Sequence, residues 1–179
     1  MKKNISRLVC LLLALVVCLP LVACSGSSSS SEDPSALKQQ VESTLSDLKS
    51  CKGEAFQLAV QAVADAGIED HLNWIGVTDE ELTRAYLDNF DYEVGDVSVT
   101  GSSAQARGTI KCRSITAIVK DYLCSGSAGD AEAGKQALLD TVSAASANQN
   151  DTTMYITMSD SGQWDVTGAL STKLRSICL

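Results

Sequence analysis

The sequence predicts an α+β domain in which amino-terminal helices pack on a curved antiparallel sheet of about four strands. Apolar residues recur at helical spacing in the first half of the domain, whereas apolar and polar residues alternate in several segments after Tyr92. Short Gly/Ser/Asp sequences separate the alternating segments. Helices followed by hairpins are typical of an α+β arrangement. In this chain of 179 residues, we expect a single domain at residues 36–179.

Three helices are expected first. One begins at Asp33-Pro34, because Asp caps helices and Pro fits their first turn. Its inward stripe is Leu37, Val41, Leu45, Leu48 and Cys51. A second, Phe56 to Ala66, is apolar nearly all round, which predicts packing on several sides. The third begins at the capping box Thr78-Asp79-Glu80-Glu81, and its inward residues are Leu82, Tyr86 and Phe90.

A hairpin is expected next. Its first strand alternates Tyr92 and Val94, then Val97 and Val99, around a Gly95-Asp96 interruption that indicates a bulge. Gly101-Ser102-Ser103 makes the turn. The second strand has the clearest alternation in the chain, and its inward residues are Ala104, Ala106, Gly108, Ile110 and Cys112.

Two more helices and a second hairpin complete the domain. Helical spacing marks Ile115, Ile118, Val119, Tyr122 and Leu123, and a helix capped by Asp130 is expected to run to about Ala147. Met154, Ile156 and Met158 then alternate as a strand. After a turn at Asp160-Ser161-Gly162, a return strand is expected to begin with Trp164 and Val166. A short closing helix carries Leu170, Leu174 and Ile177.

The amino terminus has the layout of an export signal. Lys2, Lys3 and Arg7 precede an apolar run that is too short to span a bilayer. It ends in Leu21-Val22-Ala23-Cys24, which resembles the lipobox of bacterial lipoproteins. The resemblance implies a signal peptide at 1–23, a diacylglycerol on Cys24 and a Gly/Ser tether at 24–35. We therefore expect a lipid-anchored domain on the extracytoplasmic side of the membrane. The alternatives are an ordinary signal peptide and an uncleaved helix.

Charge and cysteine content narrow the classes of function. Cleavage before Cys24 removes three basic residues and no acidic one, so the formal charge falls from −8 to −11, which disfavours nucleic-acid binding. Of seven cysteines, four belong to the domain, namely Cys51, Cys112, Cys124 and Cys178. An even number in an exported domain predicts two disulfides, with free buried thiols or a metal site as alternatives. A helix over 114–123 argues against a bond between Cys112 and Cys124; the pairing otherwise stays open.

Leu82 through Val166 resembles the cone-shaped, cystatin-like fold of the nuclear transport factor two and ketosteroid isomerase superfamily. The resemblance depends on Phe90-Asp91-Tyr92-Glu93-Val94, Ala104-Gln105-Ala106 and Gly162-Gln163-Trp164-Asp165-Val166. Enzymes of that superfamily place an acidic or histidine base and tyrosine donors inside the cone. The corresponding candidates are Tyr86, Asp88, Tyr92, Tyr122, Tyr155 and Asp165.

Each candidate has a simpler structural explanation. Tyr86 and Tyr122 lie on helix faces with apolar neighbours, Asp88 is expected to be solvated, and Asp165 is expected to point opposite to Trp164. His71 has no nucleophile motif beside it, and Asp79-Glu80-Glu81 is explained by the capping box. We expect no catalytic, cofactor or metal site. The leading hypothesis is a non-catalytic binding or scaffolding lipoprotein that holds a small apolar ligand, a peptide or a cell-wall component. The alternative is an isomerase-like or hydrolytic enzyme of the cone fold.

Overall fold

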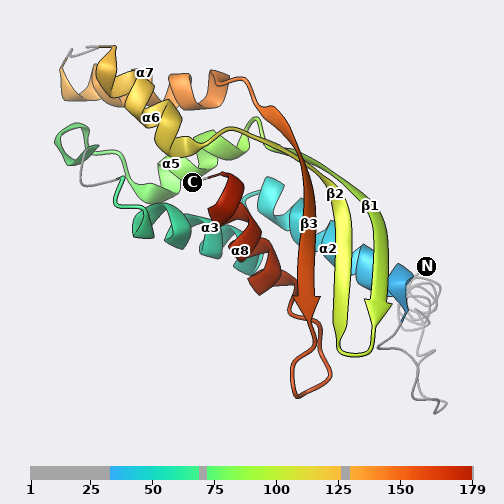
Figure 1. The fold of residues 1–179 in the computed structure, drawn as a ribbon. Helices are drawn as coiled ribbons and strands as arrows, with labels where there is room; N and C mark the ends of the chain where they lie inside the picture. The colour runs from blue at the N-terminus through green and yellow to red at the C-terminus, as the bar shows by residue number, and fades with distance from the viewer. Residues whose placement is uncertain (1–32, 69–71, 126–129, 179) are drawn as a thin grey trace, which may run out of the picture. The chain divides into compact units, whose positions relative to one another are not determined.

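The computed structural model describes residues 33–68, 72–125 and 130–178. The chain divides into two units, Met1–Ser30 and Ser31–Leu179, and all described residues belong to the second. The predicted signal peptide, Cys24 and His71 lie outside the described residues. Those that are described form six α-helices, one 3-10 helix and a three-stranded antiparallel sheet (Figure 1). The α+β class predicted from the sequence is therefore confirmed.

The first two helices form as their sequences predict. Asp33 caps α2 (Pro34–Lys49) by accepting a 2.9 Å hydrogen bond from the Ser35 N–H. The predicted apolar stripe is buried from Leu37 to Leu48. Cys51 lies just after the end of the helix, is half-buried and has a left-handed backbone conformation. Helix α3 (Gly53–Asp65) belongs partly to the core around the sheet and partly to the core among the later helices. Its nearly continuous apolar surface reflects this packing on several sides.

The capping box predicted for the third helix is present. A 3-10 helix, η1 (Asn73–Ile75), leads to α5 (Asp79–Leu87). The Thr78 hydroxyl accepts from the Glu81 N–H at 3.2 Å, and the Glu81 carboxylate accepts from the Thr78 N–H at 3.0 Å. Two backbone donors that the first turn cannot satisfy internally are thereby satisfied.

The sheet has the order β1-β2-β3, with β1 at Asp91–Thr100, β2 at Ser103–Cys112 and β3 at Asn148–Thr157. The register of β1 shifts between Val94 and Val97, where the sequence predicts a bulge. Glycine is required at 108 for a steric reason, because a Cβ there would overlap the carbonyl oxygen of Glu93 on β1. Every predicted inward residue of β2 except Gly108 is fully buried.

The remaining helices are α6 (Ile115–Cys124), α7 (Ala131–Ala144) and α8 (Val166–Ile177). Figure 1 shows α6 and α7 at the end of the sheet opposite the β1–β2 turn, with α8 beside β3. Helix α7 ends three residues earlier than expected, because Ala145 has an extended backbone that leads the chain into β3. The buried residues form two clusters: one between the sheet, α2 and α8, and one among α5, α6 and α7.

The prediction of a return strand that begins with Trp164 and Val166 is wrong. Met158 and Trp164 form a single isolated bridge, and Val166 is the first residue of α8 rather than a strand residue. The physical reason is Asp165, whose carboxylate accepts the Gly168 N–H at 2.9 Å and so begins a helix. The sheet of the described residues consequently has three strands instead of about four, and β3 is left at its edge.

None of the described helices combines the length and the apolar character needed to cross a membrane.

Candidate functional site

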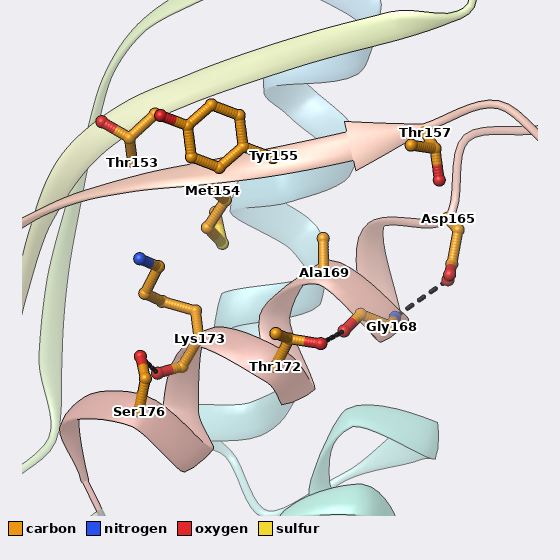
Figure 2. Close-up of a pocket in the computed structure, with 10 residues that line it drawn as sticks. All are labelled: Thr153, Met154, Tyr155, Thr157, Asp165, Gly168, Ala169, Thr172, Lys173 and Ser176. Carbon is orange, nitrogen blue, oxygen red and sulfur yellow. Dashed lines mark hydrogen bonds between the residues drawn. The ribbon is translucent and has the colours of Figure 1, made fainter.

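The candidate site is a groove of about 520 Å³ between β3 and α8. Figure 2 shows its lining side chains, with Met154 pointing from the strand toward α8 and Lys173 reaching from the helix toward the strand. Hydroxyl, charged and small apolar side chains line it together: Thr153, Met154, Tyr155, Thr157, Asp165, Gly168, Ala169, Thr172, Lys173 and Ser176. Its volume is within the range of about 300–1,000 Å³ typical of ligand pockets.

The backbone of β3 presents hydrogen-bonding groups to this groove. The Met158 N–H donates to the Ser102 carbonyl at 2.9 Å, toward the rest of the sheet. Neighbouring residues of a strand direct their backbone groups to opposite sides, so Thr157, Tyr155 and Thr153 direct theirs away from β2. The Thr157 carbonyl is used, because it accepts from the Asp165 N–H at 2.9 Å. The N–H and C=O groups of Thr153 and Tyr155 have no backbone partner among the described residues.

The wall formed by α8 carries one cation and several hydroxyls. The Thr172 and Ser176 hydroxyls donate to the carbonyls of Gly168 and Lys173, at 3.0 and 2.7 Å. Lys173 is half-buried and has no ion-pair partner among the described residues. The groove therefore offers a positive charge opposite the free strand edge, whereas the Asp165 carboxylate at its far end is used as the helix cap.

The apolar core that the described residues form encloses a small cavity. The apolar cavity that Tyr86, Leu174 and Cys178 help to line has a volume of only about 30 Å³. That volume accommodates about one water molecule and is far below that of a ligand pocket. The small inward residues Ala104 and Ala106 are 4% and 1% exposed and share a cluster with the apolar stripe of α2. Small residues on the sheet thus admit helix side chains instead of leaving a ligand cavity.

The six candidate acid, base and donor residues do not converge on one place. The Tyr92 hydroxyl donates to the Glu42 carbonyl at 3.4 Å, and the Tyr122 hydroxyl donates to the Gly134 carbonyl at 2.8 Å. Asp88 accepts a 3.1 Å hydrogen bond from the Ser143 hydroxyl. These three residues lie on three separate elements or their ends and take structural roles.

Of the other three candidates, only two share a location. Tyr155 and Asp165 both line the groove, but Tyr155 is 69% exposed on the open face of the sheet. Tyr86 lies between the two apolar clusters, and burial raises the pKa of its hydroxyl strongly. A buried phenol with a raised pKa stays protonated, so it is unsuited to act as a base at neutral pH.

The four domain cysteines are free thiols in the structure, so neither of the two predicted disulfides is present in it. Two of them are nevertheless adjacent, since the Sγ atoms of Cys112 and Cys178 lie 2.7 Å apart. Cys51 is half-buried, and burial raises the pKa of its thiol, partly offset by the Arg84 guanidinium. Cys124 is exposed at the end of α6, and that helix separates it from Cys112 as expected. Within the described ranges, no three His, Cys, Asp or Glu side chains are grouped to hold a metal ion.

The sequence does not predict the groove, because the alternation at Trp164 and Val166 predicts a strand where the chain begins α8. One local signal was available: an Asp three residues before Gly168 is a helix cap as readily as a strand residue. Lys173 carries no signal of its own in the sequence, since its place in the groove depends on the position of the β3 edge.

No family model and no curated protein matches the chain. Among solved structures, the chain is similar to a candidate lipoprotein (ycdA) from Bacillus subtilis subsp. subtilis str. 168, with 17% identity and a TM-score of 0.37. The similarity covers 79% of this chain and 44% of the other, so the chain spans less than half the length of the protein it matches.

Proposed function

We propose that the protein is an extracytoplasmic lipoprotein, held at the membrane through acylated Cys24, whose domain binds an extended peptide without chemical reaction. The basic start, the short apolar run and Leu21-Val22-Ala23-Cys24 support the anchor. Two acyl chains on one residue give stable attachment, whereas a single chain gives only marginal attachment.

The observation that carries the binding function is the free edge of β3 facing the groove. Thr153 and Tyr155 present unpaired backbone donors and acceptors there, and an extended peptide would pair with them as a fourth strand. The lining residues of β3 run from Thr153 to Thr157, which corresponds to about five residues of an added strand.

Charge and lining indicate the kind of peptide. Lys173 would pair with an acidic side chain or a terminal carboxylate, and the threonine and serine hydroxyls of the groove would accept or donate hydrogen bonds to polar groups. Met154 and Ala169 leave apolar surface for one small side chain. A purely apolar small ligand fits the interior poorly, given the cavity of about 30 Å³.

A phage-displayed library of random decapeptides, selected on the purified chain, tests the binding function. Synthetic versions of the selected peptides are then measured against Tyr155→Pro and Tyr155→Ala. Proline removes the outward N–H of an edge strand, where the ring itself is tolerated. Alanine removes the same phenol ring but keeps the N–H. Tyr155→Pro removes one backbone hydrogen bond to the peptide and disturbs the adjacent ones, so we expect it to weaken peptide affinity about tenfold. Tyr155→Ala keeps these hydrogen bonds and should weaken the affinity much less.

A charge pair of substitutions provides the second control. Lys173→Glu should weaken selected acidic peptides, whereas Lys120→Glu, at an exposed position on α6, should not. Failure to select any peptide, or selected peptides that bind Tyr155→Pro as well as the unaltered chain, would refute strand addition at β3.

The anchor is tested separately by mass spectrometry of the membrane fraction. A peptide that begins at Cys24 and carries the mass of a diacylglycerol supports it, and Cys24→Ala should move the protein out of that fraction. A chain that keeps residues 1–23, or an unmodified thiol at Cys24, would contradict the proposed anchor.

A further inference from the structure

The two adjacent thiols lie at a structurally important junction. Cys112 is the last residue of β2, and Cys178 caps the end of α8, 66 residues further along the chain. Their Sγ atoms are 2.7 Å apart, and each residue is 3% exposed. A backbone hydrogen bond also holds these two segments together, because the Ile115 N–H donates to the Cys178 carbonyl at 2.8 Å.

The surroundings of the pair favour sulfur chemistry at Cys112. The contact with the Cys178 sulfur, with smaller contributions from Tyr86 and Asn150, lowers the pKa of Cys112, and burial of the thiol opposes this shift. The same contact raises the pKa of Cys178. A thiolate is the form that attacks a disulfide, and the adjacent sulfur is placed to complete the exchange.

We propose that Cys112 and Cys178 form a disulfide that ties the end of α8 to the end of β2. The electron acceptor is a small-molecule or protein disulfide, such as oxidised glutathione. During folding, while Cys112 is still accessible, its thiolate attacks one glutathione sulfur, forms a mixed disulfide and expels one glutathione thiolate. The Cys178 sulfur, after losing its proton to solvent, attacks the Cys112 sulfur and expels the second. Two cysteine thiols are oxidised and one glutathione disulfide is reduced to two thiols.

This bond has a consequence for the groove, because α8 forms one of its walls. The start of α8 is already held to β3 by the hydrogen bond from the Asp165 N–H to the Thr157 carbonyl. A covalent bond at Cys178 would fix the other end of the helix to the same sheet. The pairing follows from the positions of the sulfurs and does not require that the groove binds a peptide.

Peptide mapping of the purified full chain tests the bond. The chain is reduced, unfolded and refolded in detergent with a glutathione redox buffer, and its remaining thiols are alkylated before digestion with trypsin. Lys111, Arg113 and Arg175 are cleavage sites, so Cys112 is released in the dipeptide Cys112-Arg113 and Cys178 in the peptide that begins at Ser176. The expected result is that these two peptides are joined and that Cys112 is no longer alkylated.

The variants Cys51→Ser and Cys124→Ser serve as matched controls, and both should keep the joined peptides. Cys112→Ser should leave Cys178 alkylated. Full alkylation of Cys112 and Cys178 in the unaltered chain, or a bond from either to Cys51 or Cys124, would overturn the proposal. Because the oxidant is supplied in the buffer, neither outcome depends on the lipid anchor or on peptide binding.

Discussion

If Cys112 and Cys178 form the proposed disulfide, its reduction is expected to lower the melting temperature of the domain substantially. The bond would close a loop between residues separated by 66 positions. In the chain-entropy description, a loop of this length restricts the unfolded chain enough to stabilise the fold by about 4 kcal/mol. At about 2–4 °C per kcal/mol for a domain of this size, the shift is about 10–15 °C.

Circular dichroism at 222 nm during heating measures the effect, with and without a phosphine reductant. The double variant Cys112→Ala/Cys178→Ala is the control, and its melting temperature should not depend on the reductant. Comparing each protein with itself removes the cost of filling the two buried positions with smaller side chains. The Cys51→Ser/Cys124→Ser variant should retain the full shift.

Two results would refute this reasoning. If the unaltered chain melts at the same temperature with and without reductant, the loop is not closed in the folded protein. If the double alanine variant responds to reductant as strongly as the unaltered chain, the stabilising bond lies elsewhere.

Three further substitutions test the fold. Gly108→Ala should cost about 1–3 kcal/mol in urea unfolding, because its Cβ would overlap the Glu93 carbonyl and displace β1; an unchanged midpoint would contradict the close approach. Tyr122→Phe should cost about 1 kcal/mol through loss of the buried 2.8 Å hydrogen bond to Gly134, and a neutral effect would mean that this bond contributes nothing net. The Lys135 ammonium and the Thr78 N–H lower the pKa of Glu81, so its contribution is present above the unfolded value near 4.3 and lost as the pH falls through its folded pKa. In Glu81→Gln, the free energy of unfolding should therefore fall less steeply as the pH drops below about 5. An unchanged pH dependence of the unfolding free energy in this range would exclude this role for Glu81.

The helices and the first hairpin could be predicted because local chemistry determines them. The Asp33 cap and the capping box at Thr78 and Glu81 act within one turn, and the stripe of α2 is a property of the sequence alone. The bulge at Gly95-Asp96 could be predicted because it interrupts an otherwise regular alternation. In each case, the residues that decide the structure are neighbours in the sequence.

The fourth strand could not be predicted correctly because two local signals compete at the same residues. Trp164 and Val166 alternate like a strand, but Asp165 satisfies the Gly168 N–H and starts α8. Tertiary packing decides between them, since Val166, Leu170 and Leu174 of the helix are buried in the cluster around the sheet. Alternation over three residues is too short to outweigh a capped helix with a buried face.

The same competition explains why the candidate site was absent from the sequence prediction. A return strand would have paired with the outward groups of Thr153 and Tyr155 and closed that edge of the sheet. The helix instead lies beside the edge and leaves the groove between them, with Lys173 on its wall. An unpaired strand edge is normally covered or blunted, because it invites pairing with other chains. Helix α8 walls this edge from Thr153 to Thr157, which is why we propose peptide binding there and not in the apolar cavity of about 30 Å³.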